Sequence, residues 1–272
     1  MNSIAEPPVR YAIAKSTGNS EIDGINPNMT LWRYIDLSKL VSLIDSSALY
    51  FTRSDILGDP FEGSITTHRL ELRQKEEENW KRTKRPKMLT ANSKDLVETA
   101  IKNTIINCWH MNENESTAMW KLYLKSDEGV AIRSSFSRLL SSIPENHDTE
   151  QQPSVEGWKS TLYVRAIAVK YIDYNKEKTG LSTPFLFKRL TFAHEQEMRL
   201  IIQDDSMQGD PRPSRFPKGG DYVPIDVSRL IESIYISPYA PEWFTGVVQS
   251  IITKYGFGFP VHKSTLSDSP IH

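Results

Sequence analysis

Lys188–Ile202, with the sequence KRLTFAHEQEMRLII, is the stretch that decides the fold, because charged and apolar residues alternate over its second half. Side chains on a β-strand point alternately to the two faces of a sheet. The alternation therefore predicts a strand that holds Glu195, Glu197 and Arg199 on one face. The opposite face is expected to enter the core and carries three apolar side chains, Met198, Leu200 and Ile202.

The charged face of this predicted strand has two interpretations. Two carboxylates and a guanidinium on a rigid element suit a functional site, and they suit a row of structural ion pairs equally well. Glu197 lies between Glu195 and Arg199, so Arg199 would hold its charge while Glu195 would repel it. Glu197 is thus the stronger candidate for a functional group, and we expect Glu197→Gln to abolish activity with almost no change in melting temperature.

Strand and helix signals alternate outward from this stretch. Leu31–Ile35 and Ala48–Thr52 have the composition of strands, and Asp36 is placed to cap a helix between them. Several predicted strands follow one another without a helix, which disfavours a purely parallel sheet. We predict an α+β fold with a mixed, mostly antiparallel sheet flanked by helices. A single domain is expected over residues 31–272, preceded by a flexible arm over residues 1–30.

Charge and composition limit the partners of the chain. Its 272 residues include 33 Lys and Arg against 34 Asp and Glu, so no overall field attracts nucleic acid or an anionic membrane. The single cysteine, Cys108, excludes an internal disulfide and fits a reducing compartment. Because no apolar run has the length of a membrane span or a signal peptide, we predict a cytoplasmic protein.

Several short motifs occur in a defined order along the chain. They are Leu31–Tyr34 (LWRY), Gly58–Glu62 (GDPFE), Cys108–Trp109, Met119–Tyr123, Gly129–Ile132, and Lys188 followed by Glu195, Glu197 and Arg199. Together they resemble the bacterial family called domain of unknown function 2971, over residues 31–266. The chain departs from the family pattern at Gly58 and at Trp109–His110. The resemblance implies a bacterial protein with an accessory or phage defence role.

An ADP-ribosyltransferase-like enzyme that uses NAD is the leading functional hypothesis. Its reaction passes through a ribosyl oxocarbenium ion, which a carboxylate on a late strand stabilises. Glu195 or Glu197 would supply that carboxylate. Arg33 on the first predicted strand would hold the dinucleotide, and Tyr34 or Tyr50 would pack against the nicotinamide. Such an enzyme would be a defence or toxin-type effector.

The other candidate binding residues are expected around the same pocket. Arg33 and the two glutamates are predicted to converge, with Asp59 or Glu62 at the rim. Trp120 has the helical spacing of a core residue and would border the pocket. Two cationic side chains complete the predicted binding set, Lys188 and Arg199.

Two alternatives remain open at this point. The first is a Mg²⁺-dependent nuclease or phosphodiesterase acting on a nucleotide or nucleic acid, because hard oxygen ligands suit that ion. In such an enzyme, the metal ion would be held by four carboxylates, Asp59, Glu62, Glu195 and Glu197. The substrate phosphate would be neutralised by Lys188 or Arg189. The second is a non-catalytic module that senses a ligand or binds a partner.

Overall fold

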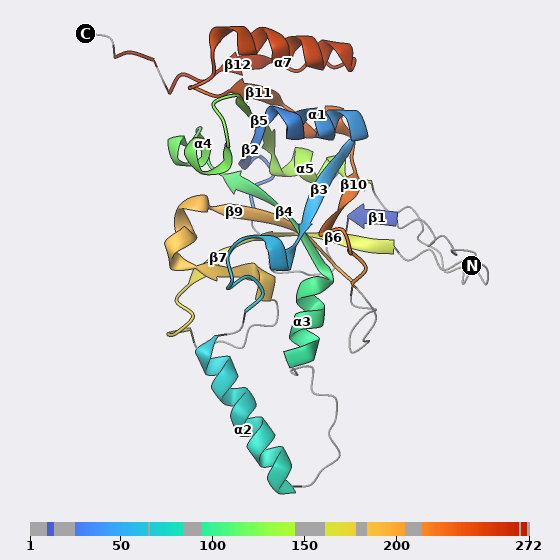
Figure 1. The fold of residues 1–272 in the computed structure, drawn as a ribbon, viewed down its shortest axis with the longest axis vertical. Coiled ribbons are helices and arrows are strands. Elements are labelled where there is room, and N and C mark those ends of the chain that lie inside the picture. The colour runs from blue at the N-terminus through green and yellow to red at the C-terminus, as the bar shows by residue number, and fades with distance from the viewer. Residues whose placement is uncertain are drawn as a thin grey trace, which may run out of the picture. The chain divides into compact units, whose positions relative to one another are not determined.

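A computed structural model describes residues 10–13, 25–64, 66–83, 94–144, 161–177, 184–204, 214–266 and 268–270 (Figure 1). The fold is α+β, with a mixed, mostly antiparallel sheet and helices, as predicted. The chain falls into two compact units. Unit 1 is drawn from residues 1–50, 108–165 and 222–272, and unit 2 from residues 51–107 and 166–221.

Unit 1 is built on a run of paired strands. β2 (Thr30–Asp36) pairs antiparallel with β5 (Gly129–Ser135) along its whole length, and β5 pairs antiparallel with β11 (Ser233–Ile236). β11 pairs parallel with the short strand β12 (Val261–Lys263). On its other side, β2 pairs antiparallel with the last residues of β4 (Thr104–Met111).

The helices of unit 1 are α1 (Leu37–Ser46), α4 (Thr117–Tyr123), α5 (Phe136–Ser142), α6 (Val227–Leu230) and α7 (Glu242–Lys254). α1 follows β2 directly, as predicted, and three apolar side chains at helical spacing are buried, Leu40, Leu43 and Ile44. Asp36 is its N-cap residue but makes no side-chain capping bond. Its carboxylate instead accepts a hydrogen bond from the backbone N–H of Lys125, 3.1 Å away.

A short strand occurs inside the segment that was expected to be a flexible arm. β1 (Arg10–Ile13) pairs parallel with the first residues of β6 (Thr161–Ala168), in a register that places Tyr11 opposite Leu162. Residues 10–13 are therefore part of the fold. Residues 1–9 and 14–24 of the expected arm lie outside the described residues.

Unit 2 contains parts of strands that also run through unit 1, together with elements that lie in unit 2 alone. The end of β3 (Ala48–Arg53) pairs antiparallel with the start of β4, where Thr52 lies opposite Ile106. β9 (Glu197–Gln203) lies between β6 and β4 in strand order. β7 (Lys170–Ile172) and β8 (Phe187–Arg189) form a separate parallel pair that places Tyr171 opposite Lys188.

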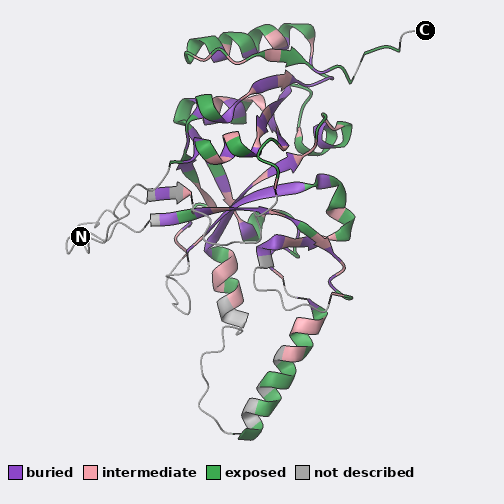
Figure 2. Cartoon of the chain, turned by 180° about the vertical axis from the view of Figure 1, so that it is seen from behind, coloured by how far each residue is buried: buried purple, intermediate pink, exposed green. Residues whose placement is uncertain are grey.

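The remaining elements of unit 2 are mostly helical. They are η1 (Ser54–Ile56), α2 (Thr67–Thr83), α3 (Lys94–Lys102), η2 (Pro184–Leu186), η3 (Leu190–Glu195) and the start of β10 (Gly220–Pro224). β4 and β9 are largely buried, whereas α2 is largely exposed (Figure 2). This exposure fits the high density of charged residues along α2. None of the helices in the described ranges is long and apolar enough to cross a membrane.

Candidate functional site

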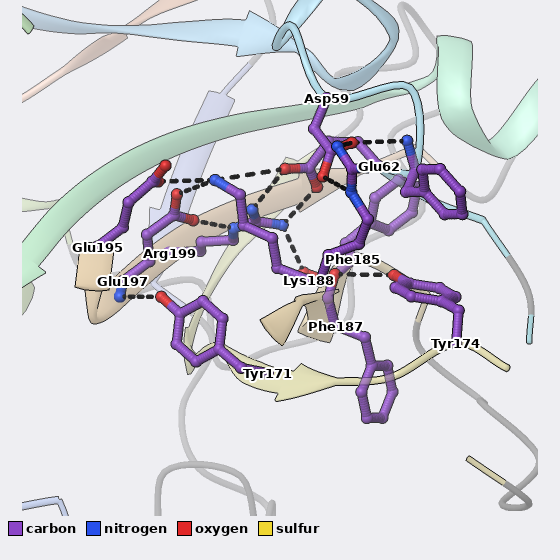
Figure 3. Close-up of polar contacts among 12 residues, drawn as sticks. Asp59, Glu62, Tyr171, Tyr174, Phe185, Phe187, Lys188, Glu195, Glu197 and Arg199 are labelled. Carbon is purple, nitrogen blue, oxygen red and sulfur yellow. Dashed lines mark hydrogen bonds and ion pairs between the residues drawn. The ribbon is translucent and has the colours of Figure 1, made fainter. Parts of the chain in front are cut away.

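Five charged side chains of unit 2 form one buried group, which we call the ion-pair cluster (Figure 3). Its members come from four elements: Glu62 from the turn after η1, Lys188 from β8, Glu195 from the end of η3, and Glu197 and Arg199 from β9. The side chain of Arg199 is 0% exposed, and that of Glu195, the most exposed of the five, is 9% exposed. Charges this deeply buried are tolerated only when they are paired and hydrogen-bonded.

Lys188 links the two glutamates that the sequence singled out. Its Nζ donates to Oε2 of Glu195 and to Oε1 of Glu197, each at 2.7 Å. Oε1 of Glu62 is 3.9 Å from the same amine. These carboxylates raise the pKa of Lys188 although burial opposes the shift, so the amine carries a proton at neutral pH.

Arg199 binds the other two carboxylates. Its Nε donates to Glu197 at 2.6 Å, and its two terminal nitrogens donate to the two oxygens of Glu62 at 2.8 and 2.7 Å. Nη1 also donates to the carbonyl oxygen of Phe185 at 2.9 Å. The paired contact with Glu62 uses the planar geometry of the guanidinium, which a lysine could not reproduce.

Glu195 reaches the cluster by a route that differs from the expected one. The period-two pattern placed it on the same strand as Glu197, but β9 begins only at Glu197 and Glu195 is the last residue of η3. Between them, Gln196 has a left-handed backbone with φ of 41°. This turn brings both carboxyl groups to one amine, whereas Met198, Leu200 and Ile202 are buried as predicted.

The two glutamates have opposite electrostatic surroundings. Burial, together with a hydrogen bond to Glu197, raises the pKa of Glu195 to about 7 and outweighs the effect of Lys188. Burial alone would also raise the pKa of Glu197, but Arg199, the bond with Glu195 and Lys188 lower it to about 2. Glu197 is therefore held ionised, and Glu195 is the member that exchanges a proton near neutral pH.

The charges of the cluster agree with this assignment. When all five groups are ionised, three carboxylates face two cations, which leaves one net negative charge in a buried site. One proton on Glu195 removes that charge. Two carboxyl groups that share one proton are a known arrangement for acid and base chemistry.

A second ion pair lies closer to the surface of unit 2. Nη2 of Arg189 donates to Oδ1 of Asp59 at 2.8 Å, and the side chain of Arg189 is 37% exposed. Its guanidinium carbon lies 4.6 Å from the ring centroid of Phe61 and 5.1 Å from that of Phe192. Asp59 also accepts from the backbone N–H of Phe61, the turn contact that an Asp-Pro sequence favours.

Two tyrosines beside the cluster were not identified from the sequence. The hydroxyl oxygen of Tyr171 accepts a hydrogen bond of 2.8 Å from the backbone N–H of Glu197, and the hydroxyl of Tyr174 donates to the carbonyl oxygen of Phe187 at 3.2 Å. Burial raises the pKa of each phenol to about 12, so both are neutral. Neither tyrosine belongs to a charged motif, and the place of Tyr171 follows only from the pairing of β7 with β8.

The other predicted site residues belong to unit 1. Arg33 donates to the carbonyl oxygen of Cys108 at 2.6 Å and lies over the ring of Trp109, and burial lowers its pKa. Tyr34 and Trp120 are buried and pack together, and the hydroxyl of Tyr34 accepts from the N–H of Ser116.

Trp120 is thus a core residue whose indole N–H donates to Glu115 at 3.1 Å. Tyr50 is 38% exposed and packs against Tyr222. The predicted convergence of Arg33 with the glutamates of unit 2 stays a prediction.

A metal site is not favoured by the donor set. Within the described ranges, no group of three or more His, Cys, Asp or Glu side chains is arranged to hold a metal ion. The carboxylates of the magnesium hypothesis are occupied by Lys188, Arg189 and Arg199. A divalent cation would have to displace these bound cations.

No family model matches the sequence, and no curated protein matches it. The resemblance to the domain of unknown function 2971 family therefore stays a prediction.

Proposed function

We propose that this protein is an NAD-using enzyme with ADP-ribosyltransferase-like chemistry, in which Glu195 is the catalytic base. The observation that carries the proposal is that the buried carboxyl groups of Glu195 and Glu197 share the amine of Lys188. A general base works best when its pKa lies near the operating pH, and Glu195 meets this condition.

The proposed reaction breaks the bond between the ribose C1′ and the nicotinamide nitrogen. The electron pair of that bond leaves with nicotinamide, and a ribosyl oxocarbenium ion develops. The oxygen of water or of an acceptor hydroxyl group then forms the new bond to C1′, and its proton passes to the carboxylate of Glu195. Glu197 stays ionised and keeps the proton affinity of Glu195 high.

The surroundings of Arg189 support a nucleotide as the substrate. Arg189 is partly exposed and lies against the rings of Phe61 and Phe192. Guanidinium groups bind phosphate, and aromatic rings stack on planar bases. The ring centroid of Phe192 also lies 4.6 Å from the amine of Lys188, which joins this surface to the ion-pair cluster.

The test is to incubate the protein with NAD, without added metal, and to measure free nicotinamide. We expect the wild type to release nicotinamide and Glu195→Gln to lose activity by about 100-fold or more. Glu242→Gln, at an exposed position on α7, is the control and should keep full activity. Absence of release by the folded wild type would contradict the proposal.

A non-catalytic binding module is the second candidate. The observation that favours it is that Lys188 and Arg199 together bind all three carboxylates of the cluster, as a purely structural network would. Under this alternative, Glu195→Gln should change stability but no chemical reaction. The comparison of nicotinamide release with unfolding curves separates the two candidates.

A further inference from the structure

The backbone of Glu197 is held on both sides by a single short segment. Its carbonyl oxygen accepts a hydrogen bond of 2.8 Å from the N–H of Val169, and its N–H donates to the hydroxyl oxygen of Tyr171, also at 2.8 Å. Glu197 is the first residue after the left-handed turn at Gln196. Val169 and Tyr171 thus hold the residue on which that turn ends.

We propose that Tyr171 is a positioning residue of the candidate site: its hydroxyl group holds the turn at Gln196 and keeps the carboxyl groups of Glu195 and Glu197 on the same lysine amine. Figure 3 shows the Tyr171 hydroxyl at the backbone of Glu197, and the amine of Lys188 joined to both carboxyl groups. The inference deepens the function proposed above and rests on it for the catalytic role of Glu195.

The register of β7 and β8 explains why this position carries a tyrosine. Tyr171 lies directly opposite Lys188 in the parallel pair. The amine of Lys188 and the phenol of Tyr171 therefore come from neighbouring positions and both bind residues next to the turn at Gln196. An aliphatic side chain at this position would leave the buried N–H of Glu197 without the acceptor that it now has. Unsatisfied buried N–H groups are rare because losing their partner is costly.

The pKa of Glu195 depends on the groups that surround it. Lys188 comes from β8, Glu197 and Arg199 from β9, Glu62 from the turn after η1, and Tyr171 from β7. If the turn loosens, Glu195 moves away from Glu197 and towards water, and its pKa falls towards the ordinary value of 4.5. The titration midpoint of Glu195 is therefore a direct readout of the turn.

The experiment follows the carboxyl carbon of Glu195 by NMR in protein labelled with ¹³C-glutamate, and the signal is assigned by its loss in Glu195→Gln. We expect Tyr171→Phe to lower the midpoint by about one pH unit or more. Tyr174→Phe is the matched control, because it removes a neighbouring phenol that donates to the carbonyl oxygen of Phe187 and does not bind the backbone of Glu197. It should leave the midpoint unchanged.

A second variant tests the turn without altering Tyr171. Gln196 is exposed and has positive φ, so Gln196→Gly keeps the turn and Gln196→Val strains it. Gln196→Val should lower the midpoint as Tyr171→Phe does, and Gln196→Gly should not. This pair keeps the test informative if Tyr171→Phe fails to fold.

The outcomes separate this inference from the proposed function. If the wild-type midpoint is raised but Tyr171→Phe and Gln196→Val leave it unchanged, the positioning role of Tyr171 is wrong and the base can still be Glu195. If the wild-type midpoint lies near the ordinary value, both the inference and the proposed base are wrong. If the midpoint moves as expected but the wild type releases no nicotinamide, only the NAD reaction is wrong.

Discussion

Glu197 is bound by two cations, and this contact set predicts its role. Arg199 and Lys188 donate to different oxygens of Glu197. We expect Glu197→Gln to reduce the free energy of unfolding by about 2 kcal/mol, because the negative charge that pairs with both cations is lost and an amide has only one oxygen to accept their two hydrogen bonds. The expectation from sequence, a nearly unchanged melting temperature, is revised accordingly.

Urea unfolding at pH 7 measures this effect, and Glu195→Gln is the comparison. An amide at position 195 resembles the protonated carboxyl group, which is one of the two forms that the wild type populates at pH 7, so its cost should be smaller. Equal costs for the two variants would contradict the assigned protonation states.

The pH dependence of stability is a second prediction at the residue scale. Glu195 has a raised pKa, so between its ordinary value of 4.5 and about 7 the folded protein holds a proton that the unfolded chain has lost. The contribution of Glu195 to the free energy of unfolding therefore decreases as pH rises from 4.5 to about 7. Glu197 has the opposite shift, and its contribution is present above 4.5 and is lost as pH falls towards 2.

Unfolding curves at pH 5, 6, 7 and 8 test this prediction. The free energy of unfolding of the wild type should fall relative to that of Glu195→Gln as pH rises, since the other titrating groups are common to both proteins. Parallel profiles for the two proteins would show that Glu195 has an ordinary pKa.

The sequence identified most of the charged residues of the cluster but not their connections. Charge and spacing pointed to Lys188, Glu195, Glu197 and Arg199, which do meet. No periodic pattern could show that one residue, Gln196, adopts positive φ and moves Glu195 off the strand. Tyr171 carries no charge and was passed over for the same reason, because its role depends on the register of two strands.

At the scale of elements, the turn that carries Glu62 depends on its glycines. Gly63 has φ of 74°, and a Cβ there would lie 2.8 Å from Ile101 and 3.0 Å from Phe185. Gly58 has φ of 96° with open space around it. Gly63→Ala should therefore cost about 3 kcal/mol, and Gly58→Ala, which is strained only by its backbone, about 1 kcal/mol.

Urea unfolding of the two alanine variants compares these costs. Because Glu62 precedes Gly63 and binds Arg199, Gly63→Ala should also disturb the ion-pair cluster. If the two variants lose equal stability, close packing around Gly63 is not what fixes this turn.

Elements with long apolar patterns were predicted well, and short ones were not. The strands at Leu31–Ile35 and Ala48–Thr52 and the helix between them occur as expected, because each buries several side chains at regular spacing. β1, β8 and β12 have only three or four residues, too few for a period to stand out. Their pairing is decided by distant partners.

For the whole molecule, the unit boundaries could not be seen in the sequence. The chain passes from one unit to the other within β3, β4, β6 and β10. A boundary is usually marked by polar or flexible linkers, and apolar strands give no such signal. The α+β class was still predictable, because it follows from the order of strands and helices and not from how they cluster.

The charge balance of the chain gives the last prediction. With a formal net charge of -1, the protein has no overall field to draw in a polyanion. Nonspecific binding to duplex DNA depends on the release of counterions by Lys and Arg, and it weakens steeply with salt.

We therefore expect a labelled 30-base-pair duplex to show no rise in fluorescence anisotropy up to about 50 μM protein at physiological salt. A saturable rise that disappears at higher salt would reveal a local basic surface. It would then favour the nucleic-acid substrate of the alternative hypothesis over NAD.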